Sequence, residues 1–224
     1  SLVGSEMCIR DRAYSEHARR YLADCGLPKE RTYVTGSPMA EVLHNNLAEI
    51  EASDVHRRLC LEKGKYILLS AHREENIDTE KNFLSLFTAI NKMAEKYDMP
   101  ILYSCHPRSR NRLAISGFQF DSRVIQHEPL GFHDYNCLQM NAFAVVSDSG
   151  TLPEESSFFT SVGHPFPAVC IRTSTERPEA IDKGDFIIAG IDEKSLLQAV
   201  DTAVELCKDD QHGIPAVSYT HLTL

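Results

Sequence analysis

Short apolar runs alternate with amphipathic stretches along the middle of the chain. Runs such as residues 66–71 and 100–106 are too short for buried helices and predict β-strands. Between them, apolar side chains recur at helical spacing, at Phe83, Phe87, Ile90, Ala94 and Tyr97, with Asp78 or Thr79 as the helix cap. The other predicted strands are residues 31–36, 123–127, 143–147, 168–172 and 186–189, and the other predicted helices are residues 132–141, 152–160 and 193–207. Residues 15–25 form a polar amphipathic segment.

This alternation of strand and helix is typical of β-α-β units. It predicts an α/β protein with a Rossmann-like parallel sheet. Ligands of such sheets bind at the carboxyl ends of the strands. The residues expected at that rim are His72, His106 and residues 129–130, 147–151 and 172–177.

The two ends differ in character from the middle. Residues 1–12 (SLVGSEMCIRDR) and 217–224 (VSYTHLTL) resemble translated sequencing-adapter read-through, so we exclude both from the prediction of the fold. The alternative is that both are genuine tails. With the first interpretation, we expect the remainder to be a piece of a longer gene.

Composition narrows the class of protein. The 224 residues, of which 42% are hydrophobic and 25% charged, fit a globular chain of one or two domains. A net charge of −9 argues against nucleic-acid binding, and no apolar run reaches the ~18 residues of a membrane span. Seven cysteines without ligand spacing predict free thiols in a reducing cytoplasm, most of them small buried hydrophobes, and no metal site.

The stretch VVSDSGTLPEESS joins an apolar strand to a helix through a turn of small residues. Thr151 and Glu154 match a capping box, which explains Glu154 structurally. The cap does not need Glu155, and a carboxylate suits a diol because it accepts two hydroxyl hydrogen bonds. The backbone amides of residues 149–151 would then face a diphosphate at the start of the helix. Phosphate and ribose together describe a nucleotide.

Two further residues leave alternatives open. Arg177 is suited to binding phosphate through paired hydrogen bonds, but a surface ion pair with Glu176 or Glu179 explains it equally well. His72 follows a strand, where it could contact phosphate, act as acid or base, or serve only as a satisfied polar turn residue.

Four motifs in order carry a family resemblance: SAHREEN, EPLGFHDY, SDSGTLPEES and TSTERPEA. Together with YSEHARRYLADCGLPKERTYVTGSP, they resemble the non-hydrolysing UDP-N-acetylglucosamine 2-epimerase family over nearly the whole chain between its ends. Many members have S-G-G-x-Q-E-E where residues 149–155 read SGTLPEE. The SGTLPEE form of this chain resembles the branch of the family that acts in the UDP-N-acetyl-L-fucosamine pathway.

The resemblance implies the C-terminal half of a two-domain glycosyltransferase-B-like fold. Residues 13–40 would be the tail of the first domain and the crossover, and residues 41–216 a truncated UDP-binding domain. The implied activity is inversion at C2 of a UDP-2-acetamido sugar by elimination and re-addition of UDP, for surface polysaccharide precursors. It implies a UDP-sugar substrate, a homodimer as full-length protein and no nicotinamide cofactor, since inversion by elimination needs no hydride carrier.

The resemblance also implies roles for individual residues. His72 would contact the UDP phosphates or assist their departure, which makes it the catalytic candidate. The UDP-binding candidates are Tyr135 near the uracil, Ser149, Gly150 and Thr151 on the diphosphate, Glu155 on the ribose and Arg177 on phosphate. Arg73 and His106 match positions linked in some members to a second, regulatory UDP-sugar site.

The family's proposed acid and base carboxylates lie in the first domain, which this chain lacks. We therefore expect this polypeptide alone to bind UDP weakly and not to epimerise. An assay of purified chain with a UDP-2-acetamido sugar checks this, and measurable C2 inversion would contradict it. Two rival classes remain, a nucleotide-sugar glycosyltransferase and a binding-only UDP module. A hydrolysing epimerase, which would release free UDP, is a closer rival.

Overall fold

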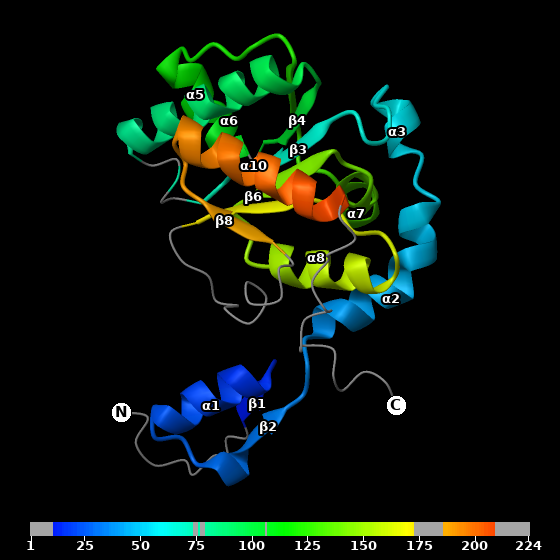
Figure 1. Ribbon diagram of the computed structural model, residues 1–224, viewed down its shortest axis with the longest axis vertical. Helices are drawn as coiled ribbons and strands as arrows, with labels where there is room; N and C mark the ends of the chain where they lie inside the picture. Colours follow the sequence, from blue (N-terminus) through cyan, green and yellow to red (C-terminus); the bar gives the residue numbers. More distant parts are fainter. Residues whose placement is uncertain (1–10, 74–75, 77–78, 106, 173–185, 209–224) are drawn as a thin grey trace.

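The computed structural model describes residues 11–73, 76, 79–105, 107–172 and 186–208. The larger part is a six-stranded parallel sheet with helices on both faces (Figure 1). Its strands are β3 (Ile67–Ser70), β4 (Ile101–Ser104), β5 (Val124–His127), β6 (Ala144–Ser147), β7 (Ala168–Ile171) and β8 (Ile187–Ala189). The helices are α2 (Pro38–Glu51), α3 (Val55–Arg58), α5 (Glu80–Tyr97), α6 (Pro107–Ser116), α7 (Phe132–Met140), α8 (Leu152–Ser161) and α10 (Glu193–Lys208). The Rossmann-like parallel sheet expected from the alternation is confirmed.

The strand order is β5-β4-β3-β6-β7-β8. The chain therefore builds the sheet outward from β3 in one direction, returns to β6 beside β3, and builds outward in the other direction. This reversal falls at the carboxyl ends of β3 and β6, the usual ligand position in open α/β sheets. Ser70 and Ser147 are paired in register at those ends.

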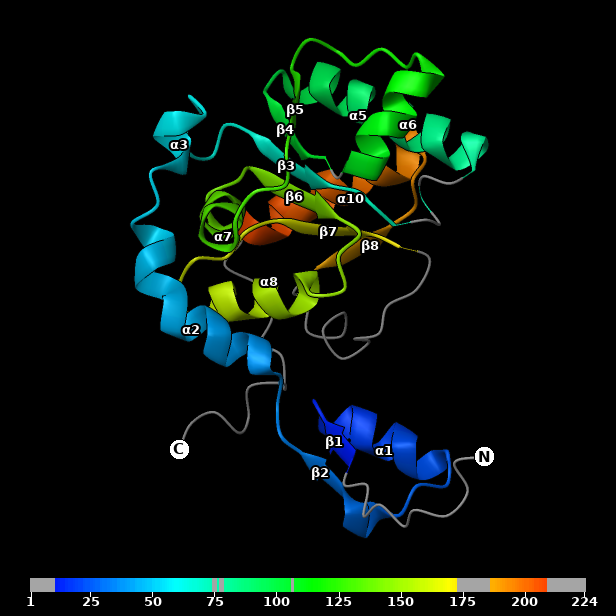
Figure 2. The ribbon, with the colours of Figure 1, turned by 180° about the vertical axis from the view of Figure 1, so that it is seen from behind.

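Side chains alternate between two cores, one on each face of the sheet, because successive strand residues point to opposite sides. Val146 and Ile67 pack with α5, α6 and α10, whereas Val145 and Leu68 pack with α2, α3, α7 and α8. Both views show these helix layers on opposite faces (Figure 2). Helix α5 begins after Thr79, whose hydroxyl accepts from the Asn82 amide, as its spacing and cap residue predicted.

A small separate unit precedes the sheet in the chain. It contains β1 (Asp11–Ala13), α1 (Glu16–Asp24), a short 3-10 turn (Lys29–Arg31) and β2 (Thr32–Val34), with β1 parallel to β2. The Ser15 side chain caps α1. Figure 2 shows the unit joined to α2 by one connecting segment. Asp11 and Arg12, which the sequence placed in an end of different character, are paired with Thr32 and Tyr33.

Several elements were not predicted from sequence. Helix α2 has a Ser37 cap and a first-turn Pro38, and its apolar residues Ala40, Leu43, Leu47 and Ile50 recur at helical spacing, so its signal was present in the sequence. Helix α6 is mostly polar, with six polar residues among its ten. The described cysteines are free thiols; Cys105, Cys137 and Cys170 are buried as expected, whereas Cys25 and Cys60 are exposed.

Candidate functional site

The site at the carboxyl ends of β3 and β6 centres on Asp148, whose side chain is fully buried. Its Oδ2 accepts the backbone amides of His72 at 2.9 Å and Arg73 at 2.8 Å, and the Asn76 side-chain amide at 3.2 Å. Asn76 also donates to the carbonyl of Ile171, at the end of β7. One carboxylate thus ties the segment after β3 to the turn after β6.

The ring of His72 is oriented by the same carboxylate. Its Nδ1 lies 3.1 Å from Asp148 Oδ1. A proton on Nδ1 makes this contact a hydrogen bond, and Oδ1 has no other partner among the described residues. The Asp148 side chain is 0% exposed, whereas that of His72 is 48% exposed, so the histidine reaches from a buried anchor toward solvent. This arrangement leaves Nε2 for a ligand.

Gly150 lies between two guanidinium groups. A β-carbon at this position would lie 3.6 Å from Nη1 of Arg172 and 3.7 Å from Nη2 of Arg73. Arg73 is held there because its Nε donates to the Asp148 carbonyl at 2.9 Å, and Arg172 is buried. The space that a side chain would fill is therefore flanked by two positive charges, a setting that suits a phosphate group.

The amides of the turn are used differently from the prediction. The Ser149 amide donates to Ser147 Oγ at 3.0 Å and the Thr151 amide to Ser149 Oγ at 3.3 Å. Local hydroxyls thus occupy two of the amides expected to face a diphosphate. Gly150 is the one whose amide makes no such bond within the described part of the chain. The guanidinium groups therefore provide most of the positive potential beside Gly150.

The capping box predicted for α8 is wrong in its details. Thr151 is the N-cap and a proline follows in the first turn, but the Thr151 side chain caps no amide. Its backbone is already helical, with φ −91° and ψ −12°. A capping side chain requires an extended backbone to reach the first free amides. The Thr151 hydroxyl instead donates to Glu155 Oε1 at 2.8 Å.

Glu155 is buried at the inner end of this site. Its Oε2 accepts a hydrogen bond from Gln139 Nε2 of α7 at 2.8 Å. Burial raises the pKa of the Glu155 carboxyl, the bonds from Gln139 and Thr151 act in the opposite direction, and the neighbouring Glu154 raises it further. Half-buried Tyr135 lies on the same helix as Gln139; burial, followed by the charge of Glu155, raises its pKa.

Comparison with known proteins identifies the family of this chain. The family described as UDP-N-acetylglucosamine 2-epimerase matches residues 4–218. The chain belongs to the UDP-N-acetylglucosamine 2-epimerase family. An enzyme of that name from Methanococcus maripaludis is 29% identical over 197 residues, which cover 84% of this chain and 51% of that protein.

Solved structures of this epimerase family agree. A UDP-N-acetylglucosamine 2-epimerase from Rickettsia bellii superposes with a TM-score of 0.78 at 37% identity, covering 88% of this chain and 51% of that one. The Methanocaldococcus jannaschii enzyme in complex with UDP-GlcNAc and UDP superposes with a TM-score of 0.77 at 27% identity, covering 86% of this chain and 53% of that one. These matches confirm the fold expected from the motifs, the C-terminal half of a glycosyltransferase-B-like fold. The chain spans about half the length of these relatives.

The predicted site residues of this epimerase-family chain fall into three sets. The first set lies at the carboxyl ends of β3 and β6 and consists of His72, Arg73, Ser149 and Gly150. The second set continues the site toward α7 and α8 and consists of Thr151, Glu155 and Tyr135. Arg73, which the resemblance linked to a regulatory site, lies beside Gly150. His106 and Arg177 lie outside the described residues.

Three residues of the site were not singled out from the sequence. Asp148 stood inside the predicted rim, and a carboxylate directly after a buried strand was the signal for it. Arg172 ended a predicted strand in the same way. Gln139 had no local signal, because its partner Glu155 lies on another helix.

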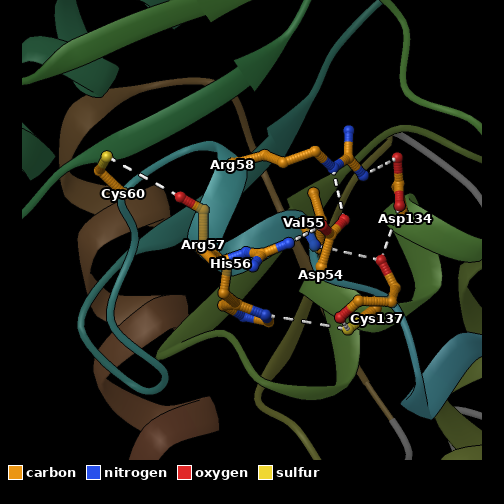
Figure 3. A network of polar contacts seen from close by, with 9 residues as sticks. Asp54, Val55, His56, Arg57, Arg58, Cys60, Asp134 and Cys137 are labelled. Carbon is orange, nitrogen blue, oxygen red and sulfur yellow. Dashed lines mark hydrogen bonds and ion pairs between the residues drawn. The ribbon is translucent and has the colours of Figure 1, made fainter.

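Helix α7, which carries Tyr135 and Gln139, is anchored by a polar network (Figure 3). Asp134 accepts from Ser53 Oγ and from Arg58 Nη2, each at 2.6 Å. Further along the helix, the Tyr66 hydroxyl donates to the Leu138 carbonyl at 2.5 Å. Contacts to α3, its preceding loop and the start of β3 thus fix the position of α7 relative to the site.

Two negative findings complete the description. Among the residues that the structure describes, no helix combines the length and apolar character needed to cross a membrane. Within the same residues, no cluster of three or more histidine, cysteine or acidic side chains is arranged to hold a metal ion.

Proposed function

We propose that this chain is the UDP-binding half of an enzyme that inverts C2 of a UDP-2-acetamido sugar. The observation that carries the proposal is the space above Gly150, flanked by the guanidinium groups of Arg73 and Arg172. It lies at the switch point of the sheet, where nucleotides bind in such folds. The M. jannaschii relative was solved in complex with UDP-GlcNAc and UDP, which supports the same ligand class here.

The proposed reaction removes the C2 proton while the bond from C1 to the UDP oxygen breaks, which leaves a 2-acetamidoglycal and UDP. UDP then adds back to C1 and a proton returns to C2 from the opposite face. This half of the enzyme holds UDP throughout, so that Arg73 and Arg172 stabilise the charge that develops on the leaving diphosphate. His72 contacts the phosphates, and Arg177 adds a further phosphate contact by family resemblance.

The hydrogen bonds of Glu155 show how the carboxylates at the start of α8 can lie beside an anion site. Glu155 accepts its hydrogen bonds from Thr151 and Gln139 and not from the two guanidinium groups. We assign it to the ribose hydroxyls, with Tyr135 near the uracil. The full-length protein would supply the acid and base carboxylates from its first domain. Its proposed setting is a cytoplasmic homodimer that makes polysaccharide precursors.

Calorimetric titration of UDP into the 224-residue chain tests this proposal. We expect Glu155→Gln to weaken UDP binding by about 1.5–3 kcal/mol, the scale of a hydrogen bond to a charged group. Glu154→Gln is the matched control: the neighbouring side chain is equally buried, at 6% exposure against 8%, and the bonds from the Gln139 and Thr151 side chains go to Glu155. Equal losses in both variants, or a folded chain that ignores UDP, would refute the placement of the nucleotide.

A further inference from the structure

Gln139 is a fully buried amide whose position in the site has no explanation in hydrophobic packing. It lies in the middle of α7 at 0% exposure and donates its Nε2 proton to Glu155 Oε2 at 2.8 Å. A buried polar side chain is costly unless it is hydrogen-bonded, so this bond is the principal stabilising contact of the Gln139 amide.

The other carboxylate oxygen of Glu155, Oε1, accepts a hydrogen bond from the end of a chain of hydroxyls. Because Thr151 donates to Glu155 Oε1, the 2.8 Å contact between Ser149 Oγ and Thr151 Oγ1 is donated by Ser149. Each carboxylate oxygen therefore accepts one protein donor. A carboxylate has about four acceptor positions. One position on each oxygen remains for a pair of adjacent hydroxyls.

The hydrogen bond from Gln139 affects the charge of the Glu155 carboxylate as well as its orientation. Burial raises the pKa of the Glu155 carboxyl, and the bond from Gln139 is the largest influence that opposes it. Two titratable groups of the described elements are coupled to Glu155: Glu154 on α8, which raises the pKa of Glu155, and Tyr135 on α7, whose own pKa is raised by the charge of Glu155. Neither supplies a positive charge. Without Gln139, protonation of Glu155 would be favoured at higher pH than in the wild type.

We propose that Gln139 is a positioning residue that keeps the Glu155 carboxylate oriented and unprotonated as the acceptor of the ribose hydroxyls. This inference rests on the proposed function, in which Glu155 binds the ribose. Gln139 itself does not touch the nucleotide. Its helix is held in place by the contacts of Asp134 (Figure 3) and by the bond from Tyr66 to the Leu138 carbonyl, so that the amide meets Glu155 without the ligand.

The test compares UDP with 2′-deoxy-UDP, titrated calorimetrically into the 224-residue chain across a pH series. Both ligands carry the same diphosphate, so the ratio of their affinities cancels the titration of the phosphates. We expect the wild type to prefer UDP by ~10-fold or more, the worth of one hydrogen bond to a carboxylate. In Gln139→Leu we expect a ratio below ~3 at neutral pH, because the Glu155 carboxylate has lost the donor that orients it and is more readily protonated.

The pH dependence adds a readout that a purely structural role would not change. As pH falls, the preference for UDP disappears when Glu155 becomes protonated. Removing Gln139 raises the pKa of Glu155, so the preference is lost at higher pH in the variant than in the wild type. The matched control is Asn136→Leu, which removes another buried amide of α7 that bonds to Phe132 and not to Glu155. It should keep the wild-type ratio and pH profile.

The outcomes separate this inference from the proposal beneath it. A wild type that binds both ligands equally overturns the ribose placement, and this inference with it. A wild type that prefers UDP, beside a Gln139→Leu variant with the same ratio and pH profile, overturns only the inference. If circular dichroism shows that the leucine variant is unfolded, Gln139→Met provides the same comparison with an unbranched side chain and no donor.

Discussion

Replacing Gly150 with alanine is expected to weaken UDP binding by ~10- to 100-fold, or about 1.4–2.7 kcal/mol. The added methyl group would occupy the space between Arg73 and Arg172, 3.6 and 3.7 Å from their nitrogens, and so exclude a phosphate oxygen from both guanidinium groups. These distances are ordinary van der Waals contacts, and Gly150 does not have a left-handed backbone. The fold should therefore tolerate alanine, with a change in unfolding free energy within about 1 kcal/mol.

Gly131→Ala is the matched control for this result. Gly131 also has an ordinary backbone, with φ −65°, and a β-carbon there would meet no atom within 4 Å. Calorimetric titration of UDP and urea unfolding of both variants separate lost binding from lost stability. Unchanged UDP affinity in a folded Gly150→Ala chain would show that the diphosphate lies elsewhere.

Replacing Asp148 with asparagine is expected to lower the free energy of unfolding by about 2–3 kcal/mol. The buried carboxylate accepts three hydrogen bonds and faces His72, and bonds to a charged acceptor contribute about 1.5–3 kcal/mol each before the amide compensates in part. Losing this charge loosens the segment that carries His72 and Arg73. UDP binding should therefore weaken as well.

Urea unfolding followed by far-UV circular dichroism measures this loss, since the chain contains no tryptophan for fluorescence. Asp98→Asn is the control, because that carboxylate is 86% exposed and asparagine tolerates its left-handed backbone, φ 48°. Its change should stay within about 0.5 kcal/mol. Equal losses in the two variants would remove the special role given to Asp148.

The sequence predicted most of the sheet and its covering helices. Helix α5 was recognisable because seven of its residues are buried on one face and Thr79 caps its start. Helix α2 was missed although its cap and its apolar residues at helical spacing were visible in the sequence, and helix α6 was missed because most of its residues are polar. The strand-turn-helix pattern singled out residues 149–151 and Glu155, and the motifs added the family, whereas the residues alone left His72 and Arg177 ambiguous.

The local sequence by itself determined most of the segments that are strands and helices, because the periods of apolar residues reflect each backbone geometry. It also placed polar residues at the strand ends. Only the tertiary structure decided which of those ends meet. Gly150 and Arg73 lie far apart in the sequence, and their approach depends on β6 returning to the side of β3. Strand order is set by packing of the whole sheet, which no local period records, and it is this order that joins Asp148 to His72 and brings two guanidinium groups to one glycine.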